Sequence, residues 1–143
     1  MSALSPPPTY ELIADKDTGK VTLPWLLFFD QVFTGDRGTP WIPTITGLTI
    51  SGTPVITGTY YQVGTLVFFS ILIVPATSTT SVNGTTYCAN FPLTMKSDTS
   101  CTAVTNAPSA ALGMCDSSSN RIYFPSWTAI TSQVTVSGWM VAS

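Results

Sequence analysis

Charged residues are scarce in this chain, and histidine is absent. Charged residues make up 8% of the 143 positions, against roughly 25% in an ordinary soluble domain. Without histidine, neither a Ser-His-Asp nor a Cys-His catalytic arrangement can be built within this chain. The five basic residues are scattered along the sequence, whereas nucleic-acid binders gather lysine and arginine on one face. We therefore expect neither those forms of catalysis nor nucleic-acid binding.

The few cysteines also argue against a metal site. Cys88, Cys101 and Cys115 match no metal-ligand spacing, and we predict no metal and no cofactor. Asp15 and Asp17 resemble the start of a calcium loop, but the acidic ligands that should follow are missing. A polar hairpin tip is the preferred interpretation of that segment. We expect the cysteines to be reduced and to serve as small, partly buried hydrophobic residues.

Long apolar segments are missing as well. The longest apolar run, 66–76, is interrupted by Ser70 and is far shorter than the roughly 20 residues that cross a bilayer. The first ten residues are polar and proline-rich rather than basic and then apolar, so no signal peptide is expected. We predict a protein that is made in the cytoplasm, stays soluble and does not insert into a membrane.

Paired carboxylates are the remaining route to catalysis. Asp30 with Asp36, or Asp98 with Asp116, could be proposed as a glycosidase-like pair. Such a pair must be held at a defined separation across a sugar-binding cleft, and nothing in the sequence specifies a cleft. Solvated loop carboxylates are far more common. We therefore predict a protein that is not an enzyme and has no catalytic residue.

The charges divide the chain into two parts. Eight of the twelve charged residues come before residue 38, which separates an N-terminal arm, 1–40, from a nearly uncharged body, 41–143. Within the arm, Pro6–Pro8 favours an extended strap, and Tyr10–Ile13 with Val21–Leu23 reads as a small hairpin.

A short aromatic helix is predicted over Pro24–Phe33, because proline suits a first helical turn. Its apolar residues share one helical face: Trp25, Phe28, Phe29, Val32 and Phe33. This face could pack on the protein's own sheet, or against a symmetry mate or another protein. The two interpretations can coexist.

The body is predicted to be an antiparallel β-sandwich of the jelly-roll type, because short apolar and threonine-rich segments alternate with turn residues. The predicted strands are Ile45–Ile50, Val55–Val63, Thr65–Val74, Thr85–Phe91, Arg121–Phe124 and Gln133–Val141. Between two of them, Asn83-Gly84 predicts a tight type I′ hairpin turn.

The predicted strand 65–74 has two apolar faces. Val67, Phe69 and Ile71 point to one side, while Phe68 and Leu72 point to the other. A sandwich strand with one wet face should instead alternate apolar and polar residues. We therefore expect both faces to be covered, the second by a neighbouring copy of the chain or by the aromatic helix. The predicted contact with other subunits or with partner proteins comprises Trp25, Phe28, Phe29, Val32, Phe33, Trp41, Val67, Phe69 and Ile71.

Aromatic residues outside the core could serve recognition by stacking on sugars or packing at an interface. Candidates for this role are Tyr60, Tyr61, Tyr87, Tyr123, Trp127 and Trp139. Of these, Tyr87, Tyr123 and Trp127 are the candidate receptor contacts. The polar stretch Lys96–Asn120, predicted to lack regular structure, and the predicted turn Thr77–Asn83 are the first choices for a contact surface.

Several motifs occur in an order that resembles small tail-fibre or virion structural proteins of bacteriophages. The motifs are Trp41-Ile42-Pro43, Gly58-Thr59-Tyr60, Val67-Phe68-Phe69, Phe91-Pro92-Leu93 and Val136-Ser137-Gly138-Trp139. The leader 17–25 and the aromatic segment 28–33 also resemble those of such proteins. Phe91-Pro92-Leu93 departs from the usual order, and the segment 96–120 has no clear counterpart.

The resemblance implies a β-sandwich, commonly trimeric, that is attached to the virion through its N-terminal part. It transfers no catalytic residue. We accordingly expect a short tail fibre that assembles with itself as a homotrimer and with other tail or head proteins, and that contacts a glycan or protein on the host surface. Its location would be the virion, after synthesis in the cytoplasm of the bacterial host. A capsid decoration or head-fibre protein is the alternative, and a carbohydrate-degrading tail enzyme is disfavoured.

Overall fold

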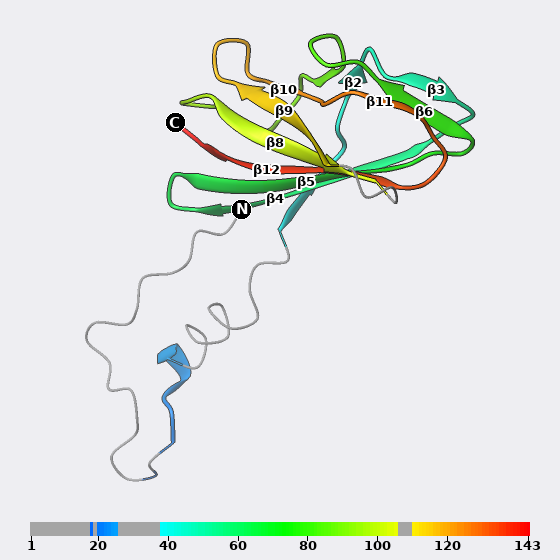
Figure 1. The fold of residues 1–143 in the computed structure, drawn as a ribbon. Helices are drawn as coiled ribbons and strands as arrows, with labels where there is room; N and C mark the ends of the chain where they lie inside the picture. Colours follow the sequence, from blue (N-terminus) through cyan, green and yellow to red (C-terminus); the bar gives the residue numbers. More distant parts are fainter. Residues whose placement is uncertain (1–17, 19, 26–37, 106–109) are drawn as a thin grey trace.

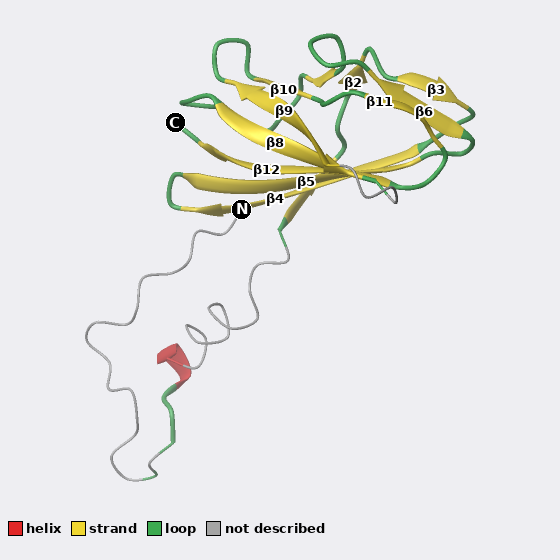
Figure 2. Ribbon diagram, viewed as in Figure 1, coloured by secondary structure: helices red, strands yellow, loops and turns green. Residues whose placement is uncertain are grey.

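Strands dominate the computed structural model, which describes residues 18, 20–25, 38–105 and 110–143 (Figures 1 and 2). The described strands are β1 (Thr39–Trp41), β2 (Ile45–Thr46), β3 (Thr49–Ser51), β4 (Val55–Val63), β5 (Leu66–Val74), β6 (Ser78–Ser81), β7 (Tyr87–Cys88), β8 (Thr99–Val104), β9 (Ala110–Asp116), β10 (Arg121–Tyr123), β11 (Trp127–Ile130) and β12 (Val134–Val141). Residues 23–25 are helical, while the rest of the predicted helix, the strap and most of the predicted hairpin lie outside the described residues.

The strands form two antiparallel sheets. The large sheet has the order β1-β4-β5-β12-β8-β9-β10-β7-β2, and the small one has the order β11-β6-β3. The large sheet curls, so that β4, β5 and β12 form one layer while β10 and β2 lie over them beside the small sheet (Figure 1). This arrangement confirms the predicted all-β, sandwich-like fold.

The hydrophobic core lies inside this curl. Along β5, Val67, Ile71 and Ile73 are fully buried, and on the neighbouring β12 Val134 and Val136 are too. These inward positions alternate with less buried ones, as the two-residue period of a strand requires. Because each such side chain contributes about 1.5–3 kcal/mol when fully buried, the β5–β12 pair is a major source of stability.

An aromatic cluster fills one end of the core. Phe91 lies at its centre, with ring centroids 5.2 Å from Trp41, 5.7 Å from Tyr60 and 5.8 Å from Phe69, all in edge-to-face geometry. Aromatic pairs favour this geometry because the positive ring edge meets the negative face. The cluster ties β1, which crosses the predicted boundary between arm and body, to β4 and β5.

Buried hydroxyl groups connect the small sheet to the rest of the body. The Ser81 hydroxyl donates to the Pro125 carbonyl at 2.8 Å, and the Thr86 hydroxyl donates to the Gly47 carbonyl at 3.0 Å. Such groups are costly to bury unless they are hydrogen-bonded. The segment Thr77–Asn83, predicted to be a turn, thus contains β6 and much of this buried network.

The predicted strand Ile45–Ile50 is wrong as one element. Gly47 adopts a φ of +77° and separates β2, which joins the large sheet, from β3, which joins the small one. A Cβ at Gly47 would collide with the Thr85 carbonyl oxygen. The chain therefore changes sheets at a residue that must be glycine.

The predicted Asn83-Gly84 hairpin is also wrong, because β6 and β7 lie in different sheets. Among the described non-glycine residues, positive φ angles occur at Asn120 and Ala129, so Asn83 lacks the positive φ of a type I′ turn. Gly84 has a φ of +80°, and the Thr85 amide donates to the Val82 carbonyl at 3.1 Å. These features match a type II turn, which leads from one sheet to the other.

The stretch Lys96–Asn120, predicted to lack regular structure, contains β8 and β9. They pair from Thr99↔Cys115 to Val104↔Ala110, and β8 also pairs with β12 in the middle of the sheet. Small residues such as Ala103 and Cys101 face the core here. Their low hydrophobicity made this hairpin resemble a loop in the sequence.

Candidate functional site

The most unusual surface of the protein is one side of the large sheet. We call the side of β4, β5, β12, β8 and β9 that faces away from the core the outer face. Eight large apolar side chains on it are at least 40% exposed: Val55, Val63, Phe68, Val74, Val104, Leu112, Met114 and Trp139. Eight such side chains on one face exceed the scattered single apolar residues that a soluble monomer normally exposes, and large apolar patches often mark an interaction site.

The outer face is also uncharged over most of its extent. The sequences of β4, β5, β12 and β8 contain no charged residue, and β9 contains Asp116 at its last position. Serine and threonine occupy the positions between the apolar residues, as in the cross-strand row Thr59, Ser70, Ser137 and Thr102. The surface is therefore polar in places without carrying charge.

Three aromatic residues lie side by side across this face. Phe68 on β5 pairs with Tyr61 on β4 and with Trp139 on β12, and we call these three residues the aromatic row. Phe68 is 46% exposed and Trp139 is 45% exposed. Because neighbouring strands are about 4.8 Å apart, the three side chains project as a ridge at one register of the sheet.

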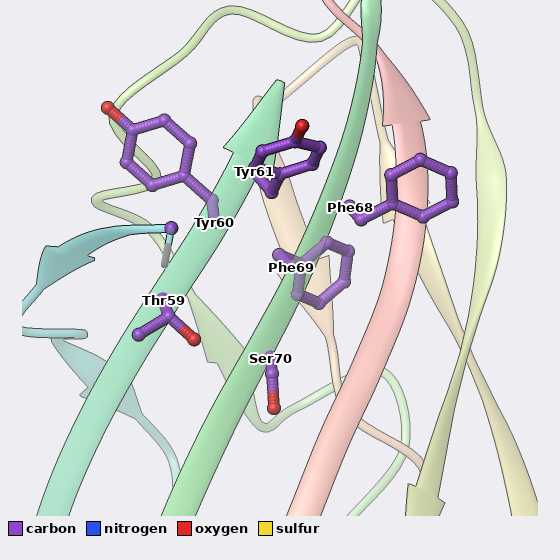
Figure 3. Close-up of a pocket in the computed structure, with 7 residues that line it drawn as sticks. Thr59, Tyr60, Tyr61, Phe68, Phe69 and Ser70 are labelled. Atoms are coloured by element: carbon purple, nitrogen blue, oxygen red, sulfur yellow. The ribbon is translucent and has the colours of Figure 1, made fainter. Parts of the chain in front are cut away.

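Grooves lie on both sides of Phe68. One, of about 330 Å³, is lined by Gly38, Thr59, Tyr61, Phe68 and Ser70 among others (Figure 3). The other groove, of about 430 Å³, borders Phe68 and Trp139 and extends over β12 to β8. The ridge and its two grooves give the outer face the relief that a packed interface needs.

The predicted interface residues on β5 face the other way. Val67, Phe69 and Ile71 are 0–4% exposed and belong to the protein's own core, so their assignment to a contact with other subunits is corrected. Both faces of this strand are apolar, and the sequence pattern could not distinguish the inner from the outer one. The exposed set is instead the alternate residues, including Phe68 and Val74.

The remaining predicted interface residues divide into two groups. Trp41 packs in the aromatic cluster, 5.2 Å from Phe91 between ring centroids, and contributes to the core. Trp25 is partly buried. The other four, Phe28, Phe29, Val32 and Phe33, lie outside the described residues.

Two of the three candidate receptor contacts lie together on the surface side of the sheet. The rings of Tyr87 and Tyr123 are 5.5 Å apart between centroids, and the Arg121 guanidinium carbon lies 4.3 Å above the Tyr87 ring. The hydrogen bond from Arg121 lowers the pKa of Tyr123 below its ordinary value. This cluster borders a hollow of about 320 Å³ lined by Asn83, Gly84, Met114, Asp116 and Tyr123.

Trp127, the third candidate, lies in the core. It is 8% exposed, its indole nitrogen donates to the Thr79 hydroxyl at 3.2 Å, and its ring stacks on Phe124. Tyr60 is likewise 8% exposed, within the aromatic cluster. The structure therefore removes both residues from the set that could meet a ligand at the surface.

The two described aspartates organise the turns at one end of β8 and β9. Asp98 accepts hydrogen bonds from the amide and hydroxyl of Ser117, and Asp116 accepts them from the Ser118 and Ser119 hydroxyls. These bonds hold the pKa of both carboxyls below the ordinary value. Asp98 is thus bonded to Ser117 across the β8–β9 pair, and Asp116 is bonded within its own turn.

All three cysteines are buried, as expected, and form no disulfide. Cys88 donates to the Asn90 side-chain oxygen at 3.3 Å, and burial raises the pKa of its thiol. Cys101 and Cys115 lie on the adjacent strands β8 and β9. The hydrogen bond with Cys115, followed by burial, raises the pKa of Cys101.

Comparison with protein-family models, with curated proteins and with solved structures finds no match for this chain. Within residues 38–105 and 110–143 and the short described stretch before them, no group of three or more metal-ligating side chains occurs. No helix in that part of the chain is long and apolar enough to cross a membrane.

Leu112 and Met114 on the outer face were missed by sequence reasoning. They alternate with small residues along β9, and that two-residue period is the signal that could have located them.

Proposed function

We propose that this protein is a structural component of a bacteriophage particle, a short tail fibre that is anchored through its N-terminal part and presents the β-sandwich to the host surface. The observation that carries the proposal is the uncharged, apolar outer face around Phe68 and Trp139. A surface of this kind often marks a site of interaction with another protein. The motif order from Trp41 to Trp139 supports a phage particle as the setting.

A fibre works through many weak contacts rather than one tight site. Several copies on one particle raise the effective concentration of each contact, so weak contacts add without high individual affinity. The Tyr87 and Tyr123 pair, beside Arg121, is the described aromatic surface that we assign to the host glycan or protein. Homotrimeric assembly, as in the phage proteins that the chain resembles, would supply three such surfaces per fibre.

The test is to count this protein on purified particles. Particles from a lysate of cells that carry the gene are banded on a density gradient, and the protein is quantified by mass spectrometry against the major capsid protein. A few dozen copies at most per particle would support a tail fibre. Hundreds of copies would favour the capsid decoration protein instead, and absence from the particle band would contradict both.

A further inference from the structure

We propose that copies of this chain pack against one another through the outer face, with the aromatic row of one copy seated in the grooves of the next. This inference deepens the proposed function and rests on it in one respect, because a protein that works by assembly needs a surface for its own copies. The proposed occupant of the outer face is a second copy of this chain.

The absence of charge over most of the face suits contact between identical copies. Where copies meet around a two-fold or a three-fold axis, residues near that axis lie beside their own equivalents in the next copy. A charged residue near the centre would then face its own equivalent, and like-charge juxtaposition across an interface is costly. The strands β4, β5, β12 and β8 contain no charged residue, so this face can meet its own copy without repulsion.

The size of the face is also sufficient. Five strands spaced about 4.8 Å apart, with up to nine residues rising about 3.3 Å each, cover on the order of 500 Å². Two copies would together bury on the order of 1,000 Å², the lower limit for a specific interface. The relief of the ridge and grooves adds area to this flat value.

The chemistry of the face favours protein over a sugar. Sugars are held by stacking on aromatic rings together with hydrogen bonds to polar groups, and the aromatic row and the serine and threonine row offer both. The margins of this face are aliphatic, however, and a sugar would leave them exposed. Val55 is 62% exposed, Val104 is 54% exposed and Leu112 is 70% exposed. Two sheets that pack face to face about 10 Å apart interdigitate the side chains of their facing surfaces, which would bury these aliphatic residues.

The test is the solution mass of the full-length protein, measured by light scattering on a sizing column. We expect the wild type to elute as a dimer or trimer of the 15.2 kDa chain. The double variant Phe68→Ser, Trp139→Ser should elute as one copy at the same concentration. The matched control, Ile42→Ser with Ile50→Ser, removes two exposed apolar side chains outside the outer face and should keep the wild-type mass.

Folding is checked by circular dichroism and a cooperative thermal transition. If the double variant does not fold, the solution mass of Leu112→Lys is measured instead. This variant adds a charge at a 70% exposed position of the same face and should also elute as one copy. A reduced mass of a folded face variant supports the inference. A wild type that is monomeric at every concentration, or face variants with the wild-type mass, would overturn it.

This result is independent of the particle count. If the copies associate through another surface, the protein can still be found on particles in the numbers of a tail fibre, and the proposed function stands. If the face variants become monomeric but the protein is missing from particles, the interface stands and the proposed function fails.

Discussion

The indole of Trp41 occupies the space that a side chain at Gly58 would fill. The two residues are paired across β1 and β4. A Cβ at Gly58 would lie 2.7 Å from both Cδ2 and Cε3 of Trp41 and 2.8 Å from Cγ of Pro43. The missing side chain thus lets a three-residue edge strand seat its large aromatic residue against the core.

Substitution of Gly58 by alanine should therefore destabilise the fold. Overpacking of this kind costs about 1–3 kcal/mol, and we expect that loss in the free energy of unfolding measured with urea. In the Trp41→Ala background the same Gly58→Ala change should cost much less, because the colliding ring is gone. A double-mutant cycle without coupling between the two positions would contradict this account of the contact.

At Ala129 we predict a substitution that stabilises the fold instead. It has a φ of +48° within the irregular pairing of β11 with β6, a region that costs a residue with a Cβ about 1–2 kcal/mol. Ala129→Gly should raise the free energy of unfolding by up to about 1 kcal/mol, once the greater entropy of glycine in the unfolded chain is subtracted. Ala89→Gly, at an exposed alanine without a positive φ, is the control and should lower it.

Strand positions were predictable wherever apolar residues alternated strongly. Val55–Val63 was predicted with the bounds that β4 has, and the prediction for β5 differed by one residue. Sequence reasoning failed at Gly47, where a strand changes sheets, because nothing local shows which sheet continues. It failed again at β8 and β9, where small core residues such as Ala103 carry little hydrophobic signal.

The sequence predicted that β5 has a second apolar face, but it did not predict which residues form that face. The two apolar faces of β5 predicted that both would be covered, and in the structure the second face carries exposed side chains such as Phe68 and Val74. The choice between Phe69 and Phe68 as the outward residue depends on how the sheet curls, which β12 and β8 decide from far along the chain. A single strand contains no information on that choice, because its pattern is symmetric.

Acid should weaken the fold partly through Asp98 and Asp116. Both have a pKa below the ordinary value in the folded protein because serine groups donate to their carboxylates. A depressed pKa in the folded state contributes stability above the unfolded pKa of about 3.9, and this contribution is lost as pH falls through the folded pKa. The melting temperature should consequently fall between about pH 4 and pH 2.

The double variant Asp98→Asn, Asp116→Asn should show a shallower fall in melting temperature over the same pH window. Ser117→Ala with Ser118→Ala retains both carboxylates but removes donors to each of them. It should flatten the profile in the same direction. An unchanged slope in both variants would show that the acid sensitivity originates elsewhere in the chain.

The three thiols should react with a thiol reagent at the rate at which the protein unfolds. Cys88, Cys101 and Cys115 are 0–1% exposed, and burial raises the pKa of Cys88, which disfavours the reactive thiolate. We expect less than one equivalent to react in minutes under native conditions and three equivalents in denaturant, as followed by Ellman's absorbance. Ser51→Cys, which adds an exposed thiol on β3 of the small sheet and outside the outer face, should add one rapidly reacting equivalent. A native thiol that reacts as fast as this added one would mean that its own element opens readily, β7 for Cys88 or the β8–β9 hairpin for Cys101 and Cys115, and that the core described around it is not the stable one.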